Sequence, residues 1–507
     1  MAGTEGAYCT PLFSPDGQWL AFTIGSEVKK VPVDGGPVMS IGTAEGSSGL
    51  SWGVAQTIVT GGVSLVAFPA AGGAPRVVLG ESAIAPNRPT AVDVTSGSGL
   101  GFRWPLALDD GETVLFNTWG SGGVAGATIT AASLSTGKMV PLNISGTFPL
   151  RVIDGLLIYG ATTGAIMAVP FDAKRVRVTG NPVPVAQDVV VDAAGAVKAA
   201  VSASGELIYL SGQSMTQPVL IDGRSIGKPV IDEARVYSTP RYSPDGGRIA
   251  FTIGAAQSID VWIYDIAKGT LTRLTTVGTN MRPEWMPDGK RVVFRSERQN
   301  GPGIWWQPAD GSGPAELLYK PTTDPFEAIV SPDGKYLVYR TSPGARYSRD
   351  IFYVGLQGDT TPKPLVVSPY AEQMPRISPD GRWMAYMSDE TGQFEVYVRP
   401  FPMAGGRIQV STTGGQDPLW SRDGHTLFYR SGQRIMAASV TTKQSFTIKG
   451  RSVVAEGDFV PNASHPNYDV APDGKHFLMI KRAGGEALTM VVHNWLPEVR
   501  ARIAAKK

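Results

Sequence analysis

Short runs of alternating apolar and polar residues, separated by turns, follow one another along most of this chain. The repeat that begins near residue 238 shows four of them, at 240–242, 248–252, 260–265 and 271–275. Alternation with a period of two, rich in β-branched and aromatic residues, predicts half-buried β-strands. Apolar residues with a helical period of 3.6 are missing from these stretches. The pattern predicts a unit of four antiparallel strands in about 42 residues.

A tetrapeptide turn marks each repeat. Ser-Pro-Asp-Gly, or a close variant, occurs at 14–17, 243–246, 286–289, 331–334, 378–381, 421–424 and 471–474. From Asp245 onward its aspartates are 43, 45, 47, 43 and 50 residues apart. Proline presets φ for a turn, aspartate accepts hydrogen bonds from the following backbone, and glycine provides the positive φ. We therefore expect a positive φ at Gly246, Gly289, Gly334 and Gly381. A strand-and-turn period of this length is typical of β-propeller blades.

The whole chain divides into about eleven such units, so we expect an all-β protein of about eleven four-stranded blades. Single propellers usually hold four to eight blades, which favours two rings over one large ring, the alternative. We expect an N-terminal propeller over 1–237, with about five blades and possibly incomplete, and a C-terminal one over 238–507 with about six. The alternating segment 488–495 is expected to be the last strand of the final blade of the second ring, with Trp495 buried.

Composition fits this fold and excludes several function classes. The 61 glycines and 39 prolines among 507 residues suit closely spaced turns. A net charge of +2 argues against nucleic acid or an anionic membrane as a partner. The single cysteine, Cys9, excludes intramolecular disulfides. We find neither a run of about 20 apolar residues, as a membrane-spanning helix needs, nor a signal-peptide pattern.

The repeats resemble TolB-type, WD-repeat-like propellers. Several further segments resemble the C-terminal propeller region of bacterial membrane-anchored serine/threonine protein kinases: 9–17, 29–36, 102–105, 306–311, 395–402 and 492–495. That resemblance covers essentially the whole chain. It implies a sensor or scaffold module of a kinase-type signalling protein, located outside the cytoplasmic membrane in the periplasm or cell envelope.

The chemistry of such kinases is not found in this sequence. It contains no Gly-rich nucleotide loop, no His-Arg-Asp catalytic loop and no Asp-Phe-Gly triplet. A prolyl-oligopeptidase-like peptidase would need a Gly-x-Ser-x-Gly elbow, which is also missing. The four histidines have no metal-ligand spacing, and turn formation accounts for the repeated aspartates. We therefore expect a non-catalytic binding module without metal or cofactor. The alternative is a propeller hydrolase or lyase that uses residues at the channel mouth.

Candidate ligand contacts lie on the innermost strands and on the connections that enter them, because loops on a rigid scaffold often carry function. The position two residues before each turn holds Arg241, Glu284, Ile329, Arg376, Leu419 and Asp469. Arg241 and Glu284 occupy successive blades, which predicts an ion pair between blades or a charged lining at the channel mouth. The candidate ligand-binding residues are Arg241, Arg282, Glu284, Arg376, Gln416, Asp417 and His465. The ligand is an unspecified protein, peptide or small molecule.

Overall fold

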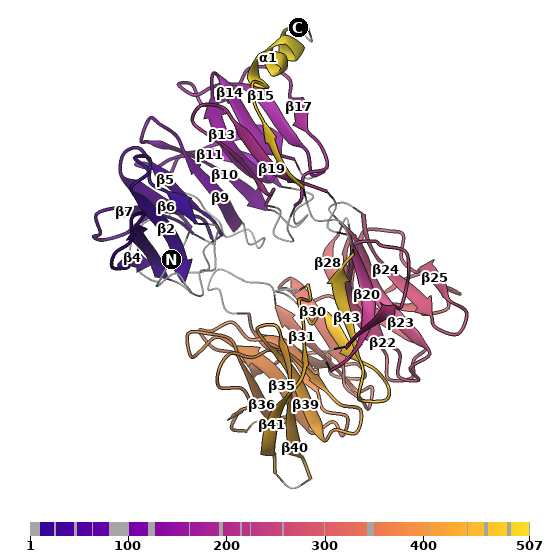
Figure 1. The fold of residues 1–507 in the computed structure, drawn as a ribbon. Coiled ribbons are helices and arrows are strands. Elements are labelled where there is room, and N and C mark those ends of the chain that lie inside the picture. The colour runs from indigo at the N-terminus through magenta and orange to yellow at the C-terminus, as the bar shows by residue number, and fades with distance from the viewer. Residues whose placement is uncertain are drawn as a thin grey trace. The chain divides into compact units, whose positions relative to one another are not determined.

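The computed structural model describes residues 11–24, 27–44, 48–62, 64–80, 101–119, 127–161, 163–191, 196–212, 215–223, 225–255, 258–298, 300–341, 349–403, 405–443, 445–460, 465–483 and 488–505. Over these residues the fold is nearly all β, as expected (Figure 1). The described ranges contain one helix, α1 (Leu496–Ala505), at the C-terminal end. The strands form eleven antiparallel sheets, most of them four-stranded. The propeller-type, all-β fold class is confirmed.

The chain forms two compact units with a boundary different from the expected one. Unit 1 contains residues 1–213 and 486–507, and unit 2 contains residues 214–485. The expected junction at 237 is too late because the strands just before it join unit 2. They pair with strands from the far end of that unit, in the order β21-β20-β43-β42. The repeat pattern did not show these distant partners.

Unit 2 contains six sheets, each named here from its innermost strand outward except the last, which is in chain order. They are β22 (Tyr237–Tyr242), β23 (Arg248–Ala255), β24 (Ser258–Asp265) and β25 (Thr270–Arg273); β26 (Thr279–Trp285), β27 (Arg291–Arg298), β28 (Gly301–Pro308) and β29 (Glu316–Tyr319); β30 (Pro325–Val330), β31 (Tyr336–Thr341), β32 (Ile351–Gly355) and β33 (Lys363–Val366); β34 (Gln373–Ile377), β35 (Trp383–Ser388), β36 (Glu395–Pro400) and β37 (Ile408–Gln409); β38 (Gln416–Trp420), β39 (Thr426–Ser431), β40 (Arg434–Thr441) and β41 (Thr447–Glu456); and β20 (Thr216–Asp222), β21 (Ser225–Pro229), β42 (Tyr468–Val470) and β43 (Phe477–Arg482).

Packing contacts run from each sheet of unit 2 to the next. β22 contacts β26, β26 contacts β30, β30 contacts β34, and β34 contacts β38. Leu419 and Phe428 of the fifth sheet share a buried cluster with Tyr468 and Phe477 of the sixth. β42 of the sixth sheet contacts β22 of the first. The sequence of contacts therefore returns to its starting sheet.

Unit 1 contains five sheets. They are β1 (Leu12–Phe13), β2 (Trp19–Ile24), β3 (Glu27–Pro32) and β4 (Met39–Thr43); β5 (Leu50–Gly53), β6 (Thr57–Thr60), β7 (Leu65–Pro69) and β8 (Arg76–Leu79); β9 (Gly101–Ala107), β10 (Thr113–Trp119), β11 (Thr128–Ser133) and β12 (Met139–Ser145); β13 (Phe148–Ile153), β14 (Leu156–Gly160), β15 (Ile166–Asp172), β16 (Arg177–Val178) and β17 (Val183–Ala186); and β18 (Ala199–Val201), β19 (Leu207–Ser211) and β44 (Leu488–Val492).

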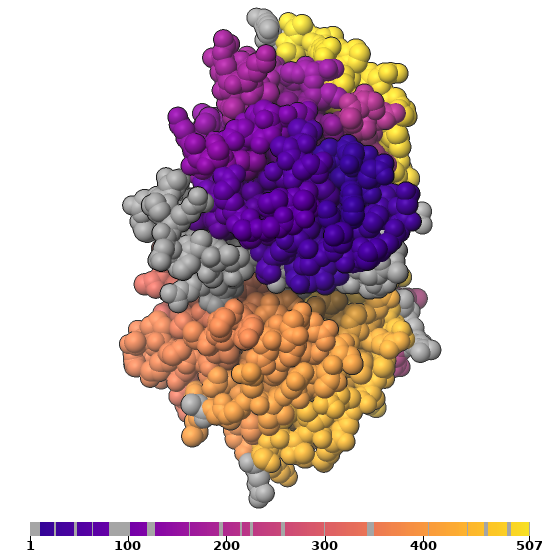
Figure 2. All heavy atoms as spheres, turned by 90° about the vertical axis from the view of Figure 1, so that its left-hand side faces the viewer, coloured from indigo at the N-terminus to yellow at the C-terminus, as the bar shows by residue number. Residues whose placement is uncertain are grey.

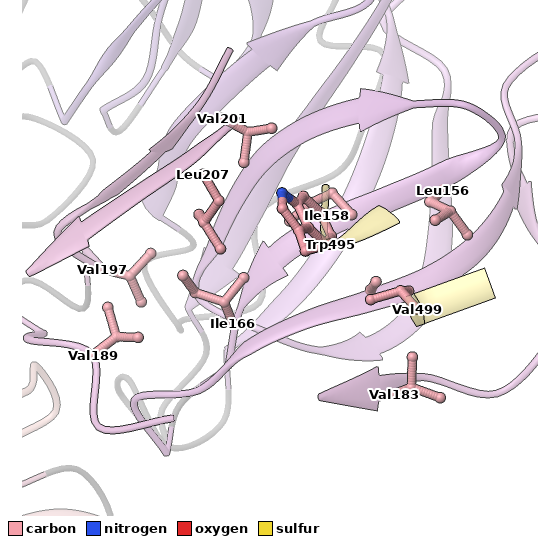
Figure 3. Close-up of a cluster of buried hydrophobic side chains, with 11 residues drawn as sticks. Leu156, Ile158, Ile166, Val183, Val189, Val197, Val201, Leu207, Trp495 and Val499 are labelled. Atoms are coloured by element: carbon pink, nitrogen blue, oxygen red, sulfur yellow. The ribbon is translucent and has the colours of Figure 1, made fainter. Parts of the chain in front are cut away.

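The C-terminal segment belongs to unit 1, so its expected position in the final blade of the second ring is wrong. β44 pairs with β19, which places Leu207 opposite Val492 and Ser211 opposite Leu488. Trp495 is only 5% exposed, as expected, but its surroundings are in unit 1. It shares a hydrophobic cluster with Ile158 and Leu207 (Figure 3), and its indole nitrogen donates to the Gly205 carbonyl at 2.6 Å. A distant strand pairing decides this location.

The turn geometry follows the sequence prediction. Ser243 Oγ donates to Asp245 Oδ1 at 2.5 Å, and the same carboxylate oxygen accepts from the Gly247 amide at 3.0 Å. The φ angles of Gly246, Gly289, Gly334 and Gly381 are 77°, 67°, 71° and 72°. These glycines therefore occupy the left-handed region, where a side chain is unfavourable.

In the space-filling view, the indigo and purple residues of unit 1 and the orange residues of unit 2 each form a closely packed surface (Figure 2).

Candidate functional site at the centre of unit 2

A β-bulge shapes the innermost strands of unit 2. In four of them, a non-glycine residue with positive φ precedes a proline: Thr239, Arg282, Met374 and Asp417, with φ between 49° and 56°. The pairing register of each strand shifts across this dipeptide. A bulge bends a strand and re-aims its side chains. The bulge therefore determines where the following charged residues lie.

Glu284 is the hub of the charged cluster that these strands bring together, which we call the central network. Its Oε1 accepts from Arg241 Nε at 2.8 Å and lies 3.0 Å from Arg376 Nη2. The three residues come from β26, β22 and β34. The expected ion pair between Arg241 and Glu284 is therefore confirmed, and Arg376 joins the pair from a third sheet.

His465 reaches the same centre from the connection that precedes β42. The imidazole is fully buried, with Nδ1 2.7 Å from Glu327 Oε2 and Nε2 3.1 Å from Glu284 Oε1. Arg376 Nη2 lies 3.3 Å from the same Nε2. Nδ1 is placed to donate to Glu327, whereas Nε2 lies between the Glu284 carboxylate and the Arg376 guanidinium. Burial, reinforced by Arg241, lowers the pKa of His465.

Glu327 and Arg340 complete the central network. Arg340 Nε donates to Glu327 Oε1 at 2.7 Å, and both side chains are fully buried. Burial disfavours the charged carboxylate, but Arg340 and His465 outweigh it and keep the pKa of Glu327 below its ordinary value. The same opposition holds for Glu284, where Arg376 and Arg241 lower the pKa in spite of burial. Both glutamates are therefore ionised at neutral pH.

Sequence reasoning missed Glu327 and Arg340. Glu327 stands four residues before the turn that begins at Ser331, the same offset as Arg282 and Asp417 in their repeats. The repeat containing Glu327 has the apolar Ile329 two residues before its turn, where four of the other repeats carry a charged residue. Comparing both offsets would have found Glu327. Arg340 lies on β31 directly opposite Glu327 on β30, so the register of this hairpin places it against the carboxylate.

Gln416 and Asp417 form a separate polar group on β38. Arg430 Nε donates to Asp417 Oδ2 at 2.7 Å, and its Nη2 donates to Gln416 Oε1 at 3.0 Å. The Tyr468 hydroxyl donates to the Asp417 carbonyl at 2.8 Å. Burial raises the pKa of Asp417 even though Arg430 pairs with it. Of the seven candidates, four meet in the central network: Arg241, Glu284, Arg376 and His465. Gln416 and Asp417 instead form hydrogen bonds with Arg430.

Arg282 is the remaining candidate, and its surroundings differ from those of the other arginines. Its guanidinium carbon lies 3.7 Å from the centroid of the Phe326 ring, and Nη1 donates to the Phe326 carbonyl at 2.9 Å. Among the described residues it has no carboxylate within ion-pair distance. Burial and the nearby charges of Arg295 and Arg340 lower its pKa. The residue as a whole is partly exposed.

Exposed apolar side chains lie on two connections that enter innermost strands. Val277 precedes β26 and is 60% exposed, while Val367 and Tyr370 precede β34 and are 56% and 43% exposed. Because the sheets of unit 2 share one strand order, the connections that enter the innermost strands lie at the same end of the unit. We call this the connection end. Gln373 begins β34, and both polar atoms of its buried amide have no hydrogen-bond partner.

The residues that the structure describes hold neither a metal-ligand cluster nor a membrane-spanning helix. No cluster of three or more histidine, cysteine, aspartate or glutamate side chains in these ranges has a geometry suited to a metal ion. Within the same ranges, no helix has both the length and the apolar character to span a membrane.

The chain resembles TolB-type β-propellers. A family model for the TolB beta propeller domain matches residues 200–349. The Tol-Pal system protein TolB of Francisella tularensis subsp. holarctica (strain OSU18) is 28% identical over 159 residues, covering 31% of this chain and 36% of that protein. TolB of Wolinella succinogenes is 24% identical over 214 residues, covering 40% and 49%. This chain therefore spans between a third and a half of the length of these relatives.

Solved structures show the same similarity. A putative TolB from Agrobacterium tumefaciens aligns with a TM-score of 0.40 and 19% identity, covering 54% of this chain and 100% of that one. TolB from Acinetobacter baumannii aligns with a TM-score of 0.38 and 15% identity, covering 75% and 79%. The match at 200–349 includes three of the repeats of unit 2, those with turns at 243–246, 286–289 and 331–334.

Proposed function

We propose that this protein is a non-catalytic binding module in which unit 2 is a closed propeller and binds a carboxylate-bearing peptide segment at its connection end. The observation that carries the proposal is Arg282, a partly exposed residue whose guanidinium has no acidic partner among the described residues. An arginine edge is well suited to bidentate carboxylate binding.

The charge balance of the central network supports Arg282 as the ligand contact. Arg241, Arg340 and Arg376 face three acidic residues, namely Glu284, Glu327 and Asp469, all of which act on this cluster electrostatically. The three arginines bind Glu284 and Glu327, and Asp469 accepts from the backbone amide of Tyr242, so we assign these residues to holding innermost strands of unit 2 together. Arg282 lies beyond this balance. A peptide carboxylate would neutralise it without displacing any ion pair.

Apolar groups at the same end favour a peptide or protein ligand over an inorganic ion. Val277, Val367 and Tyr370 are largely exposed and would cover the apolar side chains of a bound segment. Peptide interfaces commonly combine such an apolar surface with a few polar anchors. The resemblance of repeats 200–349 to TolB propellers supports the scaffold.

A phage-displayed random peptide library, selected on the purified full chain, tests this proposal. We expect enriched peptides to carry aspartate, glutamate or a free C-terminal carboxylate beside apolar residues. Arg282→Gln should weaken their binding about tenfold or more, because a buried charged hydrogen bond is lost. Arg298→Gln is the matched control, since Arg298 also stacks on an aromatic ring, that of Trp305 at 3.8 Å. Equal binding by wild type and Arg282→Gln would reject the site.

The absence of catalysis is tested separately with generic peptidase, esterase and glycosidase substrates. We expect no turnover above background. Turnover that Arg282→Ala or Asp417→Ala abolishes would show that the protein is an enzyme that uses its channel mouth.

We also propose that the module senses or scaffolds for a serine/threonine kinase-type signalling protein. This rests on the resemblance of segments such as 395–402 and 492–495. Sequencing the genomic region upstream of the codon for residue 1 tests it. An in-frame kinase domain followed by a membrane helix would support the assignment and an extracytoplasmic location, and a gene without them would contradict it.

A further inference from the structure

The sheet β18-β19-β44 has three strands, whereas most sheets of this protein have four. β44 is the outermost of the three and pairs only with β19 among the described residues. Its outer edge therefore presents backbone N–H and C=O groups in the position that a fourth strand holds elsewhere. An edge of this kind is a template for another strand.

Other outer strands carry features that discourage such pairing. Charged residues lie on β8, β16, β25, β29, β33 and β41, and prolines lie on β12, β17 and β21, while β37 has only two residues. Charges, prolines and short length are the usual protection of a sheet edge. β44 reads Leu-Thr-Met-Val-Val and has none of them. β4 is the other unprotected outer strand, but its Ile41 is buried.

The side chains of β44 are exposed on both faces of the sheet. Leu488 and Met490, on one face, are 66% and 37% exposed, and Val491, on the other, is 54% exposed. Ile208 lies directly opposite Val491 on β19 and is 45% exposed. A strand added beside β44 would therefore cover apolar surface on both faces as well as satisfy the backbone.

We propose that β44 pairs with β44 of a second copy of this chain, antiparallel about Met490. In this register Leu488 lies opposite Val492, Thr489 opposite Val491, and Met490 opposite its own counterpart. No charged side chains meet, and apolar or β-branched residues lie opposite one another throughout, which favours cross-strand pairing. The contact is the same on both chains, so it closes as a two-fold dimer.

Five residues on each chain make a small interface. Stable protein interfaces bury about 1,200 Å² or more, and small ones belong to transient complexes. We therefore expect a reversible, concentration-dependent dimer. This interface is independent of Arg282 and of the binding function proposed for unit 2.

Sedimentation velocity of the full chain from about 1 to about 200 µM tests the proposal, a range that covers weak, transient association. We expect the wild type to move from monomer to dimer. Met490→Lys should raise the dissociation constant at least about tenfold, because two like charges would lie directly opposite each other. Val453→Lys, at a 48% exposed position on the outer strand β41, is the matched control and should dimerise as the wild type does.

Two further variants keep the test decisive if Met490→Lys fails to fold. Leu488→Glu alters the most exposed apolar side chain of the strand and should also prevent dimerisation. Met490→Cys in a Cys9→Ser background should form a disulfide dimer, because opposed Cα atoms about 4.5–5.5 Å apart fit a disulfide. The equivalent Val453→Cys variant should not. A wild type that stays monomeric throughout, or a dimer unaffected by Met490→Lys and Leu488→Glu, would overturn the proposal.

Discussion

Replacing Glu284 with glutamine tests whether the central network holds unit 2 together. The side chain is 14% exposed and contacts Arg241, Arg376 and His465 through a single carboxylate oxygen. Glutamine keeps the shape and an acceptor oxygen but removes the negative charge. Arg241 and Arg376, whose side chains are 5% and 8% exposed, would then lose the carboxylate that they share.

We expect Glu284→Gln to lower the free energy of unfolding of unit 2 by about 3 kcal/mol. Removing one partner of a buried ion pair costs roughly 3–5 kcal/mol, and the retained amide oxygen offsets a part of this. Glu316→Gln is the control. Glu316 is exposed and accepts from Trp306 Nε1 at 3.2 Å, so its replacement should cost about 1 kcal/mol or less.

Hydrogen exchange during urea unfolding measures the two units separately. Amides of β26 and β34 report on unit 2, and amides of β14 report on unit 1 and should not change. A loss below about 1 kcal/mol in unit 2, similar to that of Glu316→Gln, would show that the network contributes little to stability.

Acid provides a second measurement on the same variant. Burial disfavours the charged form of Glu284, but Arg376 and Arg241 hold the pKa of this carboxyl below its ordinary value. Its contribution is therefore complete above about pH 4.3, the unfolded pKa, and is lost as the pH falls toward the folded one. Wild-type unit 2 should lose stability more steeply than Glu284→Gln in this range. Parallel curves would refute the assignment.

Three other predictions use the same measurements. Gly334→Val should lower the free energy of unfolding by about 1–2 kcal/mol through its φ alone, because a Cβ at this position meets open space. Gly246→Val should lower it further, since its Cβ would lie 2.4 Å from Pro472 Cγ. Equal melting temperatures of Gly334→Val and the wild type would contradict this prediction. Trp495→Ala should destabilise unit 1 by about 3–5 kcal/mol and leave unit 2 unchanged, and a loss in unit 2 would contradict the pairing of β44. Burial raises the pKa of Glu372 to about 7. The free energy of unfolding should therefore fall as the pH rises from about 4.3, the unfolded pKa, to about 7. Glu372→Gln should remove this fall, and a variant with the wild-type pH profile would contradict the prediction.

The sequence alone predicted the propeller-type fold and its turns because both are local properties. Each Ser-Pro-Asp-Gly turn contains the donors, acceptors and φ preferences that it needs within four residues, as at Ser243 and Gly246. Strand alternation is equally local. The pair between Arg241 and Glu284 was predictable as well, because the two residues hold the same offset in successive repeats.

Only the tertiary structure decided which strands close each unit and which residues meet at the centre. β20 pairs with β43, and β44 pairs with β19, although long stretches of chain separate them. His465 contacts Glu327 and Glu284 across 138 and 181 residues of sequence. Turn chemistry and alternation act over a few residues, whereas these contacts depend on packing all the sheets of a unit around a common centre. A pattern of period two specifies that a strand forms, but the packed sheets select its partner.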